Sequence, residues 1–390
     1  MPLRWKSIPI GSVCVDTEQQ DAREQASRVF RYVDLSAIDR SSKRITNAVE
    51  ILGTDAPSRA RKPVRTQDVL VSTVRPNLNA VALVPEELDG AIASTGFCIL
   101  RADVAKVDPR FLFYRAQCPD FINFLADRVT GANYPAVSDT IVRNAPLPIA
   151  PLTEQRRIVA LLDEADELRR LRERADRRTA DLIPAVFYEM FGDPLSNPRN
   201  WPLPRVDALC NLLRGSSPRP KGDPRYFGGK VPRLMIEDIT RDGWRVTPKV
   251  DSLTEAGAKL SRTVPAGTVV MAVSGNIGLS AQLAVDACIH DGFVAFMNLA
   301  TDRVHDQYFI FCLKFLRQLH AQRMAGAIFQ NITTHDVKRM QIPVPPLSLQ
   351  RQFSARVGEV HALQTRQAES RRRLDDLFQS MLHRAFQGEL

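Results

Sequence analysis

The chain of 390 residues carries 53 basic and 44 acidic side chains, hence a formal charge of +9, and 44% of its residues are hydrophobic. No run approaches the roughly 18 apolar residues of a membrane-spanning helix, and the first residues lack the apolar core of a signal peptide, so we expect a cytoplasmic protein without membrane contacts. The six cysteines form no Cys-x-x-Cys pair, which argues against a zinc ribbon or a disulfide framework and predicts buried, reduced thiols. The positive charge permits nucleic-acid binding but does not require it.

Each half of the chain begins with a mixture of short strands and amphipathic helices. In the first half, β-branched runs at 69–74 and 80–85 flank a turn-rich segment and predict two strands. Apolar residues at helical spacing over 110–129 then predict a helix that is interrupted near Pro119. The corresponding elements of the second half are predicted strands at 267–275 and 283–289 and a predicted helix at 306–324. We therefore expect an α/β fold of the α+β kind in each half.

The segments that follow these globular parts are two copies of one sequence. Over 45 aligned pairs, beginning at Leu147 and Ile342, 13 residues are identical at a constant offset of 195, which is half of 390. Apolar residues three and four apart predict a helix of about 37 residues in each copy, with Thr153 and Ser348 as N-caps. Pro184 is expected to kink or break the first helix, whereas the second has no internal proline.

A long helix with one apolar stripe needs a partner with the same stripe, and each copy offers one to the other. We expect an antiparallel coiled coil with approximate two-fold symmetry that separates two globular domains. The alternative, in which each helix packs only on its own domain, stays open. The expected boundaries are 1–143 and 196–338 for the globular domains and 144–195 and 339–390 for the helical regions.

Motifs of catalysis are missing from the sequence. It contains no glycine-rich nucleotide loop, no His-Glu-x-x-His zinc motif and no Gly-x-Ser-x-Gly nucleophile motif. All six histidines lie in the second half, so none belongs to a duplicated site. The segment 223–227 differs from the Asn/Asp-Pro-Pro-Tyr/Phe motif of amino-methyltransferases at Arg225. We therefore expect neither a catalytic centre nor a metal site.

Polar loops beside the strands are the candidates for nucleic-acid contacts. The segment 216–230 combines proline, glycine, basic residues and an aromatic residue, which suits a loop that follows phosphates. The first half has no clear counterpart of this loop and contains the segment 15–30 at the corresponding place. Other loops match between the halves and carry Asn, Gln and Arg, which can bind adenine and guanine edges. The expected DNA-binding residues are Arg75, Asn77, Asn133, Tyr134, Ser217, Arg219, Lys221, Arg225, Tyr226, Ser274, Asn276, Gln330 and Asn331. For each of them, a solvated turn without a ligand is the open alternative.

The repeated element Leu/Ile-Pro-Ile/Val-x-Pro-Leu-Thr/Ser-x-Gln-Arg leads into a long charged helix, and the chain ends in Ala-Phe-Gln-Gly-Glu-Leu. In these features the chain resembles type I restriction-modification specificity subunits over essentially its whole length. The resemblance implies that each globular domain is a target recognition domain for one half of a bipartite sequence in double-stranded DNA, and that the helical pair sets the spacer. The helix starts expected to dock partner subunits are marked by Pro151, Gln155, Arg156, Pro346, Gln350 and Arg351.

The resemblance also implies partners that perform chemistry. Two modification subunits would bring S-adenosylmethionine and methylate a flipped adenine, and two restriction subunits that use ATP and magnesium could join them. The chain itself is expected to bind no cofactor and to be the non-catalytic subunit. Two other functions stay open: a self-contained DNA adenine methyltransferase, which would bind S-adenosylmethionine alone, and a coiled-coil scaffold, which would show no sequence preference in DNA titrations.

Overall fold

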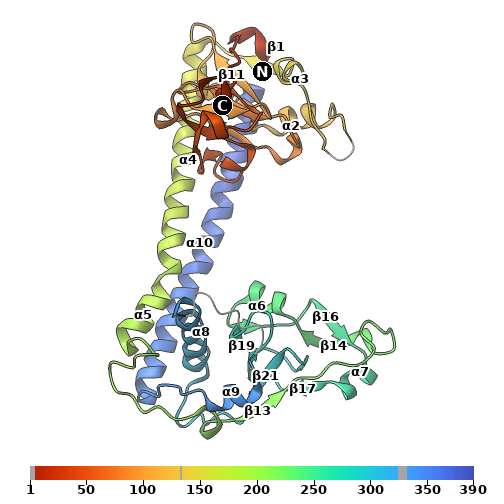
Figure 1. Cartoon of the computed structure of the whole chain (residues 1–390), viewed down its shortest axis with the longest axis vertical. Coiled ribbons are helices and arrows are strands. Elements are labelled where there is room, and N and C mark those ends of the chain that lie inside the picture. Colours follow the sequence, from red (N-terminus) through yellow and green to blue (C-terminus); the bar gives the residue numbers. More distant parts are fainter. Residues whose placement is uncertain (1–4, 132–133, 324–331) are drawn as a thin grey trace. The chain divides into compact units, whose positions relative to one another are not determined.

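The computed structural model describes residues 5–131, 134–323 and 332–390, and for 317–323 it describes the backbone alone. The chain forms two compact units. Unit 1 comprises Met1–Arg174 and Gln367–Leu390, and unit 2 comprises Ala175–Arg366. Each unit therefore contains one globular domain together with parts of both long helical segments (Figure 1).

Two four-stranded sheets form the domain of unit 1. The order of the first is β6 (Val49–Leu52), β3 (Val29–Val33), β10 (Ile92–Ser94) and β7 (Ala60–Pro63), with β3 and β10 parallel. The order of the second is β2 (Cys14–Val15), β11 (Phe97–Ala102), β8 (Val69–Ser72) and β9 (Val81–Leu83). Two further antiparallel pairs are β1 (Lys6–Pro9) with β12 (Pro146–Ile149), and β4 (Ile38–Asp39) with β5 (Arg44–Ile45).

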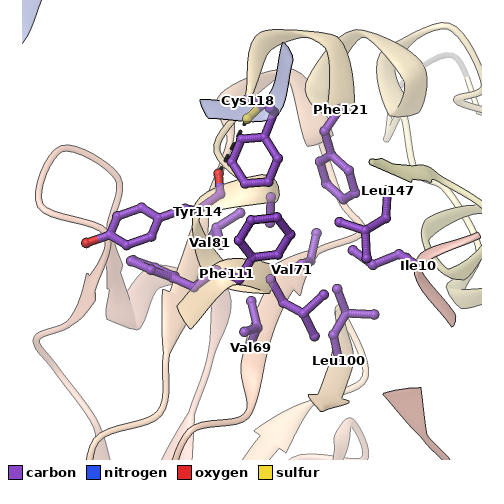
Figure 2. Close-up of a cluster of buried hydrophobic side chains, with 14 of the residues drawn as sticks. Ile10, Val69, Val71, Val81, Leu100, Phe111, Tyr114, Cys118, Phe121 and Leu147 are labelled. Atoms are coloured by element: carbon purple, nitrogen blue, oxygen red, sulfur yellow. Dashed lines mark hydrogen bonds between the residues drawn. The ribbon is translucent and has the colours of Figure 1, made fainter. Parts of the chain in front are cut away.

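Helices cover the second sheet of unit 1. They are α1 (Pro109–Arg115), α2 (Pro119–Ala126) and α3 (Asp139–Arg143). Pro119 is the first residue of α2, which confirms the predicted interruption, because proline fits the first turn of a helix but not its interior. The strand β8 is buried at every residue, as its unbroken apolar run implies, and its Val69 and Val71 pack against Phe111 and Phe121 (Figure 2).

The domain of unit 2 repeats this strand order and adds the strand β15 at the edge of one sheet. The order of one sheet is β13 (Asn211–Arg214), β21 (Phe293–Met297), β18 (Val269–Ala272), β19 (Ser280–Leu283) and β15 (Arg245–Val246). The order of the other is β16 (Asp251–Leu253), β14 (Phe227–Leu234), β20 (Ala287–Ile289) and β17 (Arg262–Val264). Its helices are α6 (Ile236–Asp242), α7 (Glu255–Leu260), α8 (Asp306–Arg323) and α9 (Thr334–Arg339). The parallel pair β14 and β20 takes the place of β3 and β10. The expected mixture of strands and helices is confirmed in both units.

The predicted strand at 283–289 is wrong. The partner of β18 is β19, which ends at Leu283, and the chain then turns before β20 begins in the other sheet. The turn contains Asp286, whose carboxylate accepts a hydrogen bond from the N–H of Ala266 at 2.8 Å. The apolar run 283–289 therefore contains the last residue of β19, a turn and all of β20. The apolar pattern alone does not predict the turn.

The long helical segments begin two residues earlier than predicted. They form α4 (Leu152–Ala180), α5 (Leu182–Phe191) and α10 (Leu347–Gln387). The carbonyl of Pro151 accepts from the N–H groups of Glu154 and Gln155, so the proline occupies the cap position and Thr153 lies inside the first turn. The same holds for Pro346 and Ser348 in α10, so both predicted N-caps are wrong. The break near Pro184 is confirmed, because α4 ends at Ala180 and α5 follows.

The helical segments run antiparallel within each unit and share the domain cores. In unit 1, Arg157 of α4 donates to the carbonyl of Leu390, while Arg169, further along α4, is 2.7 Å from Asp375 of α10. Ile158 and Phe378 belong to the same apolar cluster as the sheet of that domain. In unit 2, Phe187 of α5 packs edge-on against Phe353 of α10, with ring centroids 5.5 Å apart. Packing on a domain and packing between the helices are therefore both present.

Candidate DNA-binding surfaces

Two predicted loops of the first domain lie together in unit 1. The short 3-10 turn Pro76–Leu78 follows β8, and Arg75 before it adopts a left-handed backbone with φ 47°. The N–H of Arg75 donates to the carbonyl of Pro135 at 2.7 Å, and its guanidinium lies 5.9 Å from the ring centre of Tyr134. Tyr134 is 75% exposed and Asn77 is also exposed, so three expected residues share one surface, whereas Asn133 lies outside the described residues.

Unit 2 holds its corresponding loop by the same backbone contacts. In unit 1, the N–H of Thr73 donates to Gly96 and its carbonyl accepts from Val137. In unit 2, the N–H of Val273 donates to Gly292 at 2.8 Å and its carbonyl accepts from Ile332 at 3.0 Å. Val273 therefore corresponds to Thr73, so Gly275, with φ 66°, takes the place of Arg75, whereas Ser274 and Asn276 correspond to Val74 and Pro76. Gln330 and Asn331 lie outside the described residues.

The loop between β13 and β14 of unit 2 is fastened at one end and exposed beyond it. The Ser217 hydroxyl donates to Asp291 at 2.8 Å and accepts from Arg233 at 3.0 Å, so Ser217 anchors the loop. Arg219 is 65% exposed, with its guanidinium 3.6 Å from Asp291, and Lys221 is exposed. These two cations are therefore available to a phosphate. The anchoring of their loop by Asp291 and Arg233 could not be predicted from the sequence.

Further along this loop, Arg225 and Tyr226 form a local pair. The Arg225 guanidinium binds the Asp223 carboxylate at 2.7 Å and lies 5.4 Å from the ring centre of Tyr226. The Tyr226 carbonyl accepts a hydrogen bond from the N–H of Thr254, the residue after β16, and this bond attaches the loop to the end of that strand. Because its charge is shared with Asp223, Arg225 is a weaker phosphate ligand than Lys221.

His290 borders the same loop and is held in its neutral form. Burial, followed by the positive charge of Arg233, lowers the pKa of His290 below its usual value. Its Nδ1 accepts a hydrogen bond from the N–H of Gly292 at 3.0 Å. A neutral imidazole avoids a further buried positive charge beside Arg233. Through its hydrogen bond with Gly292, the ring stabilises the turn before β21.

In unit 1 the topologically equivalent loop has the opposite charge. Residues 16–28 connect β2 to β3, as 215–226 connect β13 to β14. The first loop contains four acidic and two basic residues, and the second contains one acidic and three basic residues. Asp21 binds Arg23 at 2.7 Å and Arg61 at 3.2 Å, while Asp16 binds Arg143 at 2.9 Å. The first loop therefore neutralises cations of its own domain and is unsuited to DNA phosphates.

Gln155 and Gln350 are fully buried at the starts of α4 and α10. The amide of Gln155 donates to the carbonyls of Lys106 and Ala150, at 3.2 and 2.8 Å, and its oxygen accepts from the N–H of Asp108 at 2.8 Å. The corresponding contacts of Gln350 are with Arg303, Pro345 and His305 at 3.0, 2.7 and 2.8 Å. Both side chains therefore fix a helix start to a domain and are out of reach of a partner. The other expected docking residues, Pro151, Arg156, Pro346 and Arg351, are exposed.

The described residues offer little chemistry beyond these surfaces. Burial raises the pKa of Cys98, Cys118, Cys210 and Cys312 to about 12, so these thiols stay protonated and unreactive at neutral pH. Across the described parts of the chain, no group of three or more His, Cys, Asp or Glu residues is placed to hold a metal ion. No helix in those parts is long and apolar enough to cross a membrane.

Comparisons with known proteins agree with this geometry. A family model described as the type I restriction modification DNA specificity domain matches residues 198–367. A chain from a solved type I restriction-modification system is 32% identical, with 100% of this chain and 99% of that chain covered and a TM-score of 0.73. The HindI specificity subunit of Haemophilus influenzae, a type I restriction enzyme, is 18% identical over 86% of this chain and 89% of its own length.

A second solved structure supports the fold. The S subunit of a type I restriction-modification system from M. genitalium is 13% identical, with a TM-score of 0.52 over 98% of this chain and 96% of that one. The 32% identity over the full length of the first structure shows more than a shared fold. The chain therefore belongs to the family of type I restriction-modification specificity subunits, the non-catalytic subunits that recognise DNA.

Proposed function

We propose that each globular domain reads one half of a bipartite sequence in double-stranded DNA, that α4 and α10 pair as a coiled coil that sets the spacer, and that two copies of a modification subunit dock on the helices. One observation carries the proposal: most identities between the two copies of the helical segment are exposed in both, whereas the loops of the two domains differ in charge. Identical surfaces suit identical partners. Different loops suit different half-sites.

The agreement on the helical surface is unusual because exposed positions have no packing constraint of their own. Of the 13 identical pairs, nine are exposed in both copies. They are Pro151/Pro346, Arg156/Arg351, Ala160/Ala355, Glu164/Glu359, Leu168/Leu363, Arg177/Arg372, Arg178/Arg373, Asp181/Asp376 and Leu182/Leu377. Exposed residues that are kept although packing does not require them indicate binding.

These residues are divided between the two units in the same way. Unit 1 contains a stripe of Arg156, Ala160, Glu164 and Leu168 at spacings of four, and unit 2 contains the equivalent stripe on α10. The second group of exposed identities joins the other helix of each unit: Arg372, Arg373, Asp376 and Leu377 in unit 1, and Arg177, Arg178, Asp181 and Leu182 in unit 2. Each unit thus presents one copy of a composite surface, which predicts two copies of one partner.

Exposed leucines give each surface an apolar centre. In unit 1, Leu168 precedes Arg169, whose Nε lies 2.7 Å from Asp375, and Leu377 follows that aspartate by two residues. Leu168 is 45% and Leu377 is 49% exposed. Exposed leucines among charged side chains suit a protein interface, which has an apolar centre and a polar rim.

The partner chemistry follows from this division of labour. The modification subunits would bind S-adenosylmethionine and methylate adenine, and up to two restriction subunits would use ATP and magnesium. The described residues of this chain then supply sequence reading and spacing in the cytoplasm, without a cofactor of their own.

Exchange of domains tests the reading of half-sites. Replacement of residues 1–143 by the equivalent domain of a relative is expected to change one half-site in the methylated motif of the host genome, and replacement of 196–338 the other. The measurement is sequencing of methylated adenines with and without each exchange. A change of both halves by one exchange would contradict modular reading, and S-adenosylmethionine binding by the isolated chain would favour a self-contained methyltransferase.

Lengthening of the helices tests the spacer. Seven residues inserted between Glu167 and Arg178, with a matching insertion in α10 beside Gln367, add about 10 Å at 1.5 Å per residue. This corresponds to about three base pairs at 3.4 Å each, so the recognised spacer is expected to grow by that amount while both half-sites stay the same. Insertion into one helix alone misaligns the apolar stripes and serves as the control. Altered half-sites would contradict the helices' role as the spacer.

A further inference from the structure

The DNA contacts of the first domain need a basic surface other than the loop 16–28, whose acidic residues bind the domain's own arginines. Such a surface exists at the hairpin of β4 and β5, with the tip sequence Arg-Ser-Ser-Lys at 40–43. Arg40 and Arg44 are exposed, and no carboxylate of the described chain forms an ion pair with either. The Asp39 carboxylate is turned into the tip, where it accepts from the N–H and hydroxyl of Ser41 at 2.8 and 2.6 Å.

Lys43 connects this hairpin to a loop already assigned to DNA. Its Nζ donates to the carbonyl of Asn79 at 2.6 Å, at the end of the turn that carries Arg75 and Asn77. The backbone of Lys43 is left-handed, with φ 56°, a conformation that closes the turn between β4 and β5. The basic tip and the polar turn are thereby fixed beside each other within unit 1.

The cations around Lys43 repel one another. Burial, and then the positive charges of Arg169 and Arg40, lower the pKa of Lys43 to about 8, against a small opposite effect of Asp39. An amine held half-buried among like charges is stabilised by an incoming anion, because the anion relieves both the repulsion and the lost hydration. The phosphates of a DNA backbone are such anions.

The second domain differs at both positions. Between β14 and β16, where unit 1 has its hairpin, unit 2 has α6 and β15. Arg241 there is bound by Asp242 at 2.6 Å and by Asp238 at 3.1 Å. The loop before β14 carries the exposed Arg219 and Lys221, whereas the corresponding loop of unit 1 binds the domain's own arginines through Asp21 and Asp16.

We propose that the β4–β5 hairpin, through Arg40, Lys43 and Arg44, binds the backbone phosphates beside the half-site read by the first domain and holds Arg75, Asn77 and Tyr134 against the base edges. The inference rests on the proposed function, since it assigns the DNA contacts of one of its two readers. The two domains then approach DNA through different segments of one fold.

The test is a salt titration of target DNA with the full chain in complex with its modification subunits. The Arg40→Ala/Arg44→Ala variant removes two phosphate contacts, so the slope of log K against log salt is expected to fall by about 1.8. We expect at least tenfold weaker binding at physiological salt, for target and random duplex alike. Phosphate ethylation interference is expected to vanish only beside the first half-site.

The matched control removes the same number of charges from the other loop. Arg23→Ala/Arg28→Ala is expected to leave the salt slope unchanged, and both double variants are expected to melt with the wild type because all four side chains are exposed. If the wild-type complex prefers its target but the Arg40→Ala/Arg44→Ala variant keeps the full slope of log K against log salt, the hairpin does not bind phosphates and the inference is overturned. A wild-type complex without any sequence preference would instead overturn the proposed function.

Discussion

In the helical segments, several buried apolar positions differ between the two copies, with Ile158 aligned to Phe353 and Ile183 to Phe378, whereas the exposed positions 168 and 363 both hold leucine. In the globular domains the pattern is reversed. Apart from the extra edge strand β15 in unit 2, the strand order is the same in both, but the exposed loops 16–28 and 215–226 carry opposite charge. A core adjusts to substitutions when its neighbours change with it, whereas a surface is held constant only by what it binds.

The largest effect is expected where the repeat is both buried and polar. Gln155→Leu leaves the N–H of Asp108 and the carbonyls of Lys106 and Ala150 buried without their partner, which is expected to cost about 3 kcal/mol of the free energy of unfolding of unit 1. Urea unfolding measures the loss. Arg156→Ala, one residue away but exposed, is expected to change stability by less than about 0.5 kcal/mol. Equal effects of the two substitutions would mean that the glutamine has no structural role.

The next effect concerns the composite surface of unit 1. The Leu168→Asp/Leu377→Asp variant is expected to weaken one modification-subunit site about a hundredfold, since two apolar contacts are lost and two charges would be buried. Native mass spectrometry is expected to show one bound subunit in place of two.

Leu171 gives a matched control for the docking surface. It is 49% exposed on α4, but its repeat position in α10 is Arg366, so it is not part of the duplicated surface. Leu171→Asp is expected to keep two bound subunits. Loss of a subunit with this variant would show that any exposed leucine of the helix matters, and the repeated identities would lose their meaning.

A smaller effect is expected in the basic loop of unit 2. Arg219→Ala/Lys221→Ala is expected to weaken DNA binding about tenfold and to lower the salt slope by about 1.8, without affecting subunit stoichiometry. In ethylation interference, the affected phosphates lie beside the second half-site. Effects beside the first half-site would show that the two domains do not bind DNA separately.

The smallest effect is the pH dependence of DNA binding. The charged groups acting on Lys43 are Arg40 and Asp39 of its hairpin and Arg169 of α4, and its pKa is about 8. Because the pKa is lowered, the amine loses its proton as pH rises through 8 and must regain it to bind phosphate. Between pH 7 and 8.5 this weakens binding about fourfold. Lys43→Met is expected to abolish that dependence, and a wild type that binds equally at both pH values would contradict the role of the amine.

Sequence periodicity predicted the features that depend on neighbours along the chain. The interruption at Pro119, the break near Pro184 and the strand at 69–74 follow from local backbone chemistry and burial. Contacts between distant segments were not predictable, such as Arg75 with Tyr134 or Ser217 with Asp291, because they depend on strand order. The hairpin at 38–45 has no periodic signal. Gln155 was expected to face a partner, because a polar side chain at a helix start gives no sign of burial until its three backbone partners are known.

The glutamines at the helix starts bear on how such a protein can change over evolutionary time. Every partner of Gln155 and Gln350 is a main-chain group, so the joint between helix and domain depends on the course of the backbone and on no other side chain. A new domain with the same backbone path at this point, whatever its sequence, fits the existing helix. Such joints allow recombination to exchange one reader for another while the assembly that surrounds the helices stays intact.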